Sequence, residues 1–305
     1  MTDTITLAQL SDVHLAPLRG LALRHLNVKR GLGYLNWHRG RRRVHRRDAL
    51  DLVVADMLAH RPDHIAVTGD LINLGLPAEF EAARAWLEGL GAPDKVTVIP
   101  GNHDIYTHLG DDPGVERWAD YMRSDAWGAT YAPGRARFPF VRRLGPAALI
   151  ASNSAVPTPP FVAAGELGAR QIATLGEILA ATGREGLIRV VLIHHPPLPG
   201  QAPPRRALRD APELERVLAE HGAELVLHGH NHRDNHLDFA WMHGQIPVIG
   251  IASGSSARAH KSEPLGRYNL FRIARVDGAP HIELTTRGLD PSASRIEQID
   301  RRRIT

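Results

Sequence analysis

The sequence predicts an α/β or α+β protein with a single domain, for three reasons. Short apolar runs alternate with longer helical patterns early in the chain, and strand patterns alone follow at the end. No repeat of fixed period and no low-complexity tract interrupts them. The composition, 43% hydrophobic and 23% charged over 305 residues, excludes disordered, collagen-like and coiled-coil classes.

Nine short apolar runs are typical of strands, and five longer segments have a helical pattern. We expect strands at residues 4–10, 64–68, 95–99, 147–151, 187–193, 224–227, 247–251, 268–275 and 280–284. We expect helices at about 48–60, 77–90, 113–123, 167–181 and 212–221. Pro77, Pro113 and Pro212 stand near the first turn of three of these helices, where a missing N–H costs least.

The positive charge is concentrated in one segment. Ten Arg and Lys residues and no Asp or Glu lie between Arg19 and Arg47, so removing them from the net charge of +4 leaves −6 for the rest. The basicity is therefore local and does not indicate nucleic-acid binding by the chain as a whole. We interpret the segment as a basic insertion at 18–47 in a domain of residues 1–290, followed by a charged C-terminal tail at 291–305.

The chain contains no Cys but 18 His. Disulfides, thiolate zinc sites, iron–sulfur clusters and cysteine nucleophiles are therefore excluded, and any metal chemistry must use His, Asp, Glu or Asn. No apolar run approaches the roughly 18 residues of a membrane span. The first residues lack the basic-then-apolar layout of a secretory signal. We expect a cytoplasmic protein.

Polar clusters follow five of the predicted strands at their carboxyl ends, where open α/β sheets bind ligands. They contain Asp12 and His14, then Asp70, then Asn102, His103 and Asp104, then His194 and His195, and finally His228, His230 and His232. Alternation along an extended backbone puts Asp12 and His14 on the same side, so both can reach one ion. One such cluster is more often a surface pair or a turn. Five together predict a shared metal site.

These clusters carry a family resemblance. Asp12-Val13-His14, Gly69-Asp70, Gly101-Asn102-His103-Asp104, His194-His195 and Gly229-His230-Asn231-His232 resemble the ordered motifs of calcineurin-like metallophosphoesterases over positions from about 4 to 235. The resemblance implies a four-layer α/β/β/α sandwich of two mixed β-sheets flanked by helices. It also implies a dinuclear metal centre, whose bridging hydroxide attacks phosphorus in line.

The resemblance also assigns roles to individual residues. One ion would take Asp12, His14 and His232, the second ion Asn102, His194 and His230, and Asp70 would bridge them. His103 would donate a proton or a positive charge, and Asp104 would orient it. His195 would lie beside the ligands. His228 would either contact a ligand or be a surface residue at a strand end, the reading that we favour. These ligand types suit two divalent ions such as Mn, Fe or Zn.

Among subfamilies, the single compact domain and His194-His195-Pro196-Pro197 resemble class III cyclic nucleotide phosphodiesterases and glycerophosphodiesterases. We therefore predict a hydrolase of a small phosphodiester of either type. The alternative is a peripheral-membrane hydrolase of a lipid-linked phosphodiester or pyrophosphate, with Tyr34, Trp37 and the arginines of 19–47 at an anionic inner membrane surface. A nucleic-acid partner is not expected, because the rest of the chain is acidic. A catalytically silent metal-binding module would have lost a ligand, and none is missing.

Overall fold

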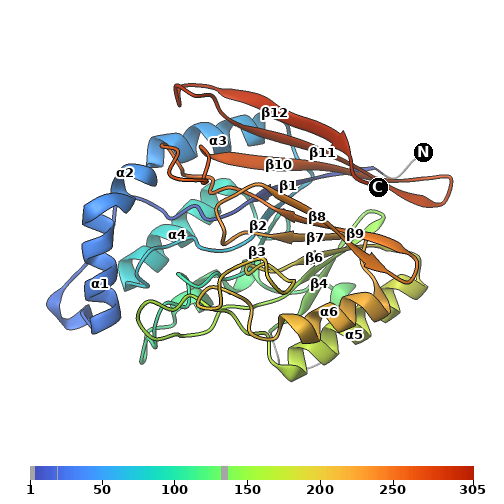
Figure 1. Ribbon diagram of the computed structural model, residues 1–305, viewed down its shortest axis with the longest axis horizontal. Coiled ribbons are helices and arrows are strands. Elements are labelled where there is room, and N and C mark those ends of the chain that lie inside the picture. Colours follow the sequence, from blue (N-terminus) through green and yellow to red (C-terminus); the bar gives the residue numbers. More distant parts are fainter. Residues whose placement is uncertain (1–3, 19, 132–136) are drawn as a thin grey trace.

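The structure is a computed structural model and describes residues 4–18, 20–131 and 137–305. Two six-stranded sheets form its centre (Figure 1). In spatial order, the first sheet contains β12 (Ile296–Arg303), β11 (Ala279–Leu289), β10 (Arg267–Val276), β1 (Ile5–Leu10), β2 (His64–Val67) and β3 (Val96–Val98). The second contains β4 (Phe140–Leu144), β5 (Ala147–Ala151), β6 (Ile188–Leu192), β7 (Leu225–His228), β9 (Gly244–Gly250) and β8 (Asn235–Trp241).

Both sheets are mixed. In the first, β1, β2 and β3 are parallel, while β10, β11 and β12 are each antiparallel to their neighbours. In the second, β5, β6, β7 and β9 are parallel, and antiparallel β4 and β8 form the edges. Parallel strands bring their carboxyl ends to the same edge of a sheet. The loops after β1, β2, β3, β6 and β7 are therefore gathered at one end of the molecule.

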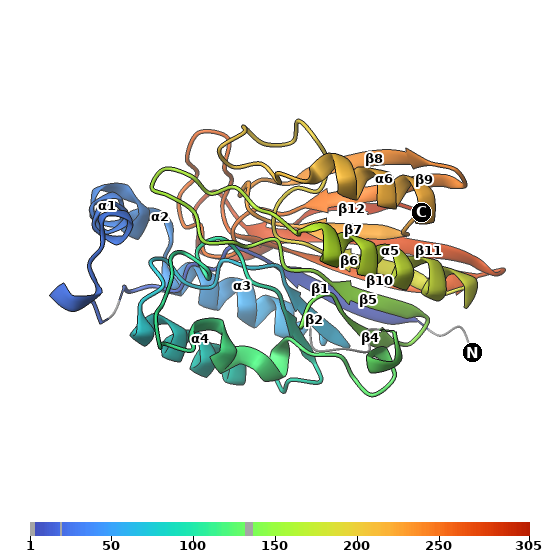
Figure 2. The same cartoon turned by 90° about the horizontal axis from the view of Figure 1, so that it is seen from below.

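Helices cover the outer face of each sheet and complete four layers. α3 (Arg47–Ala59) and α4 (Pro77–Leu90) pack on the first sheet, and α5 (Ala169–Arg184) and α6 (Ala211–His221) on the second (Figure 2). Both faces of a sheet are covered because successive side chains of a strand point to opposite sides. In β6, Val190 and Leu192 belong to the core between the sheets, whereas Val191 packs with residues of α5 and α6. The predicted α/β/β/α sandwich is confirmed.

Each predicted strand overlaps an observed one, but three strands were not predicted. β4 and β8 are edge strands, and β12 lies in the segment that we interpreted as a charged tail. That interpretation was wrong, because residues 296–303 pair with β11. Charged side chains are typical of exposed edge strands, and here they hide the alternation that predicts a strand. The helix predicted at 113–123 is the 3₁₀ helix η3 (Gly114–Tyr121), and a further 3₁₀ turn, η4 (Gly128–Thr130), precedes β4.

The basic segment extends from the end of the molecule where the strand carboxyl ends meet (Figures 1 and 2). It contains the 3₁₀ turn η1 (Leu23–His25), α1 (Val28–Asn36), the π-helical stretch η2 (Trp37–Arg41) and α2 (Arg42–Val44). The last three follow one another without a break and form one helical rod, residues 28–44. Across the described ranges of the chain, no helix is both long and apolar enough to cross a bilayer.

Candidate metal centre

Backbone hydrogen bonds fix the loops that carry the predicted ligands. The N–H of Asp12 donates to Gly69 O at 2.9 Å, which extends the pairing of β1 with β2 beyond the ends of these strands. At the ends of β6 and β7, the N–H of Gly229 donates to His194 O at 3.1 Å. Backbone hydrogen bonds alone therefore join the loop after β1 to the loop after β2, and the loop after β6 to the loop after β7.

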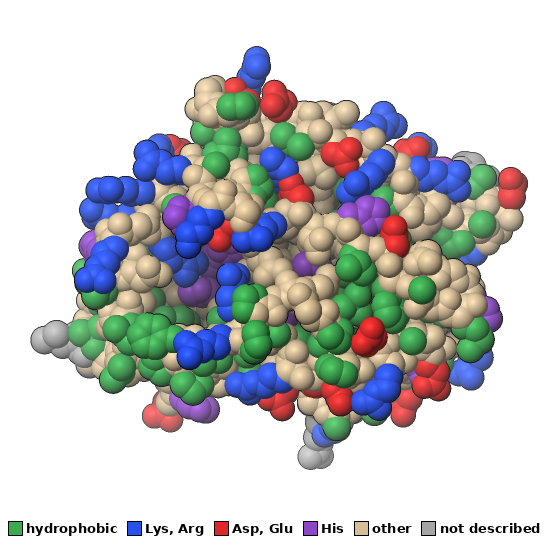
Figure 3. Space-filling view, in the orientation of Figure 1, with side chains coloured by type: hydrophobic (Ala, Val, Ile, Leu, Met, Phe, Trp, Pro, Cys, Tyr) green, Lys and Arg blue, Asp and Glu red, His purple; other side chains and the backbone are tan. Residues whose placement is uncertain are grey.

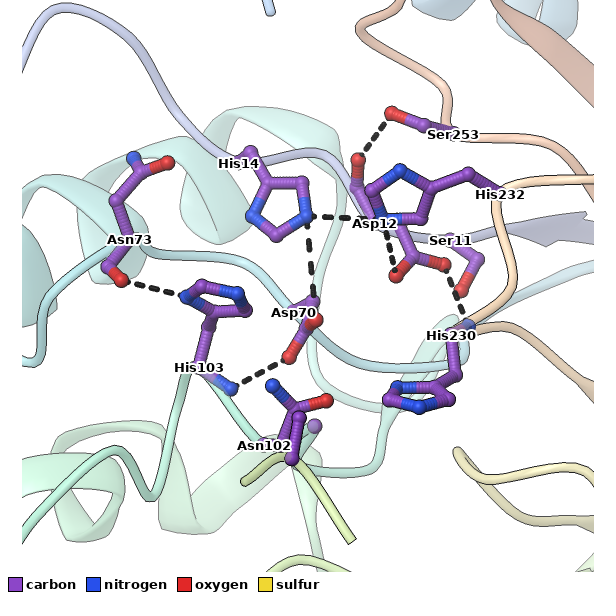
Figure 4. A network of polar contacts seen from close by, with 12 residues as sticks. Ser11, Asp12, His14, Asp70, Asn73, Asn102, His103, His230, His232 and Ser253 are labelled. Atoms are coloured by element: carbon purple, nitrogen blue, oxygen red, sulfur yellow. Dashed lines mark hydrogen bonds and ion pairs between the residues drawn. The ribbon is translucent and has the colours of Figure 1, made fainter. Parts of the chain in front are cut away.

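Asp12, His14 and His232 face one another in a first group (Figure 4). His232 Nε2 lies 3.2 Å from Asp12 Oδ1 and 3.3 Å from His14 Nε2. With Asp70 included, one ligand atom from each side chain lies within 4.8 Å of all the others. Asp12 and His14 are fully buried, and Asp70 is 2% exposed. Four donors therefore surround a space suited to one ion.

Asn102, His194 and His230 form a second group on the other side of Asp70. His194 Nε2 lies 3.3 Å from Asn102 Oδ1 and 3.5 Å from Asp70 Oδ2. Asp70, His194 and His230 again offer ligand atoms within 4.8 Å of one another. The same Asp70 Oδ2 lies 3.9 Å from His14 Nε2 of the first group. One carboxylate oxygen therefore faces both groups.

Contacts behind the ligands determine which atoms face inward. His14 Nδ1 lies 3.1 Å from Ile72 O, and His194 Nδ1 lies 2.7 Å from Thr68 O. These Nδ1 atoms donate to carbonyls, so Nε2 is the ring nitrogen through which each histidine would bind a cation. Asp70 Oδ1 accepts a backbone N–H of the loop after β3 at 2.7 Å, so Oδ2 is the oxygen that remains.

Five of the seven predicted ligands have a left-handed backbone conformation. They are Asp12 (φ 52°), His14 (φ 38°), Asp70 (φ 56°), His230 (φ 68°) and His232 (φ 53°). This conformation costs a non-glycine residue on the order of 1–3 kcal/mol and gathers at functional sites. The surrounding backbone pairing holds these residues against their local preference and turns their side chains inward.

Two glycines of the motifs allow loops to approach closely. A Cβ at Gly101 would collide with Asp70 Oδ1, and a Cβ at Gly229 would collide with Ser11 Oγ. Any larger residue would therefore push the loop after β3 or β7 away from the loop that carries its partner ligands. This contact explains why glycine directly precedes Asn102 and His230 in the sequence.

Electrostatics keeps protons on two of the imidazoles when no cation is present. Burial opposes this, but Asp70 and Asp12 raise the pKa of His194 to about 9. Against the same effect of burial, Asp12 and Glu263 raise the pKa of His232 to about 9. A divalent ion needs both imidazoles neutral, so metal and proton compete at these two positions.

The donor set fits divalent cations better than it fits a network of hydrogen bonds. Both ring nitrogens of His230 are buried, and neither has a hydrogen-bond partner among the described residues. A buried unsatisfied polar group costs about 1–3 kcal/mol, which a coordinated ion would remove. Imidazole, carboxylate and amide oxygen together suit borderline ions.

His103 lies beside the ligands, but its contacts differ from the prediction. Its Nδ1 lies 2.6 Å from Asn73 O, and its Nε2 lies 2.9 Å from Arg41 Nη1. Burial and Arg41 lower the pKa of His103 to about 4. The imidazole is therefore neutral at pH 7, with its Nδ1 proton donated to a carbonyl and its Nε2 accepting from the guanidinium.

Asp104 does not have the orienting role that we predicted for it. Its Oδ1 accepts the backbone N–H of Leu71 at 2.9 Å, and its Oδ2 accepts that of Gly101 at 2.8 Å. The residue is fully buried and joins the loop after β2 to the loop after β3. Because neighbouring side chains diverge from the backbone, Asp104 points into the protein while His103 points toward the ligands.

The two remaining histidines of the motifs are both fully buried. The ring centroid of His195 lies 4.4 Å from that of His230, and His195 Nδ1 lies 2.8 Å from Ser154 Oγ. It therefore contacts a ligand, as expected. For His228, the surface position that we favoured was wrong, because the strand end of β7 lies inside the sandwich. Its Nδ1 lies 3.1 Å from Gly229 O.

Sequence reasoning missed Arg41, which the basic insertion brings to the ligands. Its Nη2 lies 3.0 Å from His14 Nε2, in addition to the contact of Nη1 with His103. The π-helical stretch is responsible for this direction, since the N–H of Arg42 bonds to Trp37 O, five residues back. No signal distinguished Arg41 among the ten basic residues of the segment.

His45 and Glu263 were also missed. His45 is 3% exposed, and its ring centroid lies 4.5 Å from that of His14, while Nδ1 lies 2.9 Å from Ser255 Oγ. Glu263 Oε2 lies 3.4 Å from His232 Nδ1. Both support ligand imidazoles from outside the motifs. Glu263 comes from a loop without any recognisable pattern, so the sequence held no signal for it.

A cavity of about 670 Å³ opens over the two ligand groups. Figure 3 shows histidine side chains in this hollow, with Lys and Arg side chains around it. Five arginines line the cavity against two carboxylates: Arg39, Arg41, Arg43, Arg206 and Arg258 against Asp70 and Glu263. Because both carboxylates contact ligand histidines, the charge presented to a bound molecule is strongly positive.

Comparison with known proteins agrees with this geometry. The family described as calcineurin-like phosphoesterase matches residues 5–234. The chain is 29% identical over 199 residues to a cAMP/cGMP dual specificity phosphodiesterase of Mycobacterium tuberculosis. The matched region is 64% of this chain but only 55% of that protein. It is 28% identical over 233 residues to a probable cyclic nucleotide phosphodiesterase of Synechococcus sp., over 75% of this chain and 74% of the relative. A glycerophosphodiester phosphodiesterase of Enterobacter lignolyticus is 38% identical over 73 residues, 20% of this chain and 26% of its own.

Solved structures show the same fold at low sequence identity. A dimetal phosphatase from Danio rerio matches with a TM-score of 0.63 and 14% identity, over 97% of this chain and 98% of its own. A purple acid phosphatase from yellow lupin matches with a TM-score of 0.60 and 12% identity, over all of this chain and 54% of its own. Because the family match spans three quarters of the sequence, from β1 to the loop after β7, this chain belongs to the calcineurin-like phosphoesterase family.

Proposed function

We propose that this protein is a metal-dependent phosphodiesterase with a dinuclear centre. The observation that carries the proposal is the position of Asp70 Oδ2, 3.5 Å from His194 Nε2 and 3.9 Å from His14 Nε2. A carboxylate oxygen between two sets of donors can bridge two ions. One ion would be held by Asp12, His14 and His232, and the other by Asn102, His194 and His230.

The bound ions, which we expect to be Mn, Fe or Zn, would supply a water of lowered pKa and neutralise charge on the phosphoryl oxygens. The chain itself holds the ligand atoms in place through the paired loops. It also orients the imidazoles, because carbonyl acceptors fix the tautomers of His14 and His194.

Arg41 and His103 would act together on the substrate. A phosphodiester oxygen that accepts from Arg41 would draw the guanidinium away from His103 Nε2, which it contacts at 2.9 Å. The negative charge of the substrate would also raise the pKa of His103 from about 4, where burial and Arg41 hold it. His103 Nε2 could then carry a proton and transfer it to the leaving oxygen, with reprotonation from solvent.

A small, anionic diester is the substrate class that we propose. Two relatives are named as cyclic nucleotide phosphodiesterases and one as a glycerophosphodiester phosphodiesterase. The cavity of about 670 Å³ is within the usual range for small-molecule sites. Its arginines favour negatively charged ligands. The lipid-linked diester or pyrophosphate that we considered from the sequence would use the same ligands and the same arginine wall.

A substrate panel tests the proposal. The protein, loaded with Mn, is offered bis(p-nitrophenyl) phosphate, cyclic AMP, a glycerophosphodiester and a phosphomonoester, and product release is followed for each. We expect hydrolysis of one or more diesters, and loss of that activity in Asp12→Asn. The exposed Asp111→Asn serves as the matched control with unchanged activity. Activity on the monoester alone would contradict the phosphodiesterase assignment.

A further inference from the structure

Helix α1 is amphipathic in the reverse of the usual sense. Val28, Leu32 and Leu35, at positions i, i+4 and i+7, share one face and are 72%, 37% and 44% exposed. On the other side of the rod, Arg30 is 8% exposed and Trp37 is 5% exposed. An apolar stripe therefore faces solvent while a guanidinium faces the protein.

Polar contacts from the inner side anchor the rod in this orientation. Arg30 donates to Leu74 O at 3.1 Å and also to Gly75 O, both in the loop after β2. Lys29 Nζ donates to Thr158 O at 2.9 Å. Because these bonds would be lost if the helix rotated, the outward position of the apolar stripe is part of the fold.

Arginines without a carboxylate partner among the described residues precede and follow the stripe in the sequence. Arg24, Arg39, Arg42 and Arg43 are exposed, and none of the four pairs with a carboxylate in the described part of the chain. By contrast, the next arginine along the chain, Arg46, pairs with Asp48. Figure 3 shows Lys and Arg side chains concentrated at the end of the molecule that α1 and α2 occupy.

We propose that α1 docks on the surface of an anionic lipid bilayer through Val28, Leu32 and Leu35, with the flanking arginines on lipid headgroups. Exposed aliphatic side chains beside unpaired arginines are the composition of a helix that lies in the membrane interface. The stripe does not suit a second copy of this chain, since the four arginines of each copy would then repel one another.

Docking would bring the cavity close to the lipid surface. Asn36, Arg39 and Arg43 line the cavity and belong to the same helical rod as the stripe. The diester would then be met at the membrane, as part of a lipid or close to one. This second step rests on the proposed function, whereas the docking of α1 does not.

Sedimentation with vesicles tests the docking. Protein is mixed with vesicles of phosphatidylcholine alone or with 30% phosphatidylglycerol, roughly the charge of an anionic leaflet. We expect binding to the anionic vesicles that weakens with salt.

The triple variant V28S/L32S/L35S should lose at least about tenfold in affinity. Arg24→Gln with Arg42→Gln should lose about fivefold for each charge removed. Met242→Ser, at a methionine that is 75% exposed in the β8–β9 turn, is the matched control and should bind normally.

Hydrolysis of bis(p-nitrophenyl) phosphate, measured without vesicles, separates the two proposals. None of these substitutions changes a ligand or a cavity residue, so every variant should retain wild-type rates. Equal sedimentation with neutral and anionic vesicles, or normal binding by the triple variant, would overturn the docking proposal. A dimer in light scattering that the triple variant abolishes would also overturn it and assign the stripe to a second copy. Vesicle binding without hydrolysis by the wild type would overturn only the proposed function.

Discussion

The loops at the strand ends and the helical rod of the insertion form two walls of the same cavity, and they are built on opposite principles. The first wall buries Asp12, His14 and His194 completely and holds them with backbone hydrogen bonds. The second wall is a single rod that places exposed apolar and basic side chains toward solvent. Arg41 reaches the ligands from the rod itself, and His45 does so from directly after its end.

This difference indicates that the loops determine metal binding, whereas the rod contributes contacts to a bound molecule. A substitution in the first wall leaves a charge or an imidazole buried without a partner, so the whole centre is disturbed. A substitution of a cavity-lining residue of the rod, such as Arg41, would remove one contact with a bound molecule and leave the ligands in place. We therefore expect substitutions of the predicted ligands in the first wall to lower metal content, and substitutions in the rod to leave metal content unchanged.

The largest effect should come from Asp70→Asn. The amide keeps the size and the hydrogen bond to the backbone N–H of His103, but it removes the negative charge between the two groups. We expect both ions to be lost and diester hydrolysis to fall to the level of chelated protein. Metal analysis after gel filtration, beside the turnover assay, measures both. A variant with two ions and full turnover would show that Asp70 does not bridge them.

His103→Ala should retain both ions and lose turnover by about 10²–10⁴-fold on an alkyl diester, the usual range for a missing proton donor. On bis(p-nitrophenyl) phosphate, whose leaving group needs no proton, the loss should be much smaller. The exposed His108→Ala is the control. Equal losses on both substrates would assign His103 to charge stabilisation and not to proton transfer.

Arg41→Ala tests the contribution of the rod. Because Arg41 contacts His103 and His14 without being a ligand, metal content should stay normal. The rate should fall about 10²-fold, as for the loss of one donor to the developing charge. Arg41→Lys should recover part of it. The exposed neighbour variant Arg42→Ala should behave like the wild type on a soluble diester. Loss of metal from Arg41→Ala would place Arg41 in the first wall.

The pH dependence of metal binding gives the smallest and most specific difference. In the metal-free protein, the pKa values of His194 and His232 are about 9, so both carry protons at pH 7 that each ion must displace. Affinity should rise about tenfold per pH unit at each site from pH 7 toward 9, and then level off. Calorimetry in buffers of different ionisation enthalpy should detect about two released protons, one for each histidine. An affinity that does not change with pH would contradict the raised pKa values.

The first wall was predictable because its signal is repeated. Each predicted ligand follows an apolar strand, and parallel strands bring their ends together, so position along the chain translated directly into position in space. The prediction that Asp104 orients His103 did not follow from this argument, because two residues adjacent in the sequence can point their side chains in different directions. Its true partners are backbone N–H groups of the loops after β2 and β3, including that of Leu71.

The second wall was not predictable in detail, because its residues look alike in the sequence. Tyr34 and Trp37 were both considered as surface anchors, yet Trp37 is buried and only Tyr34 is exposed. Arg41 and Arg42 are adjacent and chemically identical, but one contacts the ligands and the other faces solvent. Only the direction of the helix separates such residues, and that direction depends on tertiary contacts such as that of Arg30 with Leu74.

The π-helical stretch Trp37–Arg41 changes the direction in which the side chains after it point from the rod. An ordinary α-helix turns about 100° per residue, so one residue more or less rotates everything beyond it by that angle relative to everything before. Deleting a single residue here would leave the stripe of α1 where it is and turn the end of the rod away from the metal ligands. The stretch therefore lets one short helix turn its apolar stripe to solvent and bring Arg41, near its end, to the predicted metal ligands. A change of length at this point would therefore move Arg41 away from His103 and His14 without replacing any of the three residues.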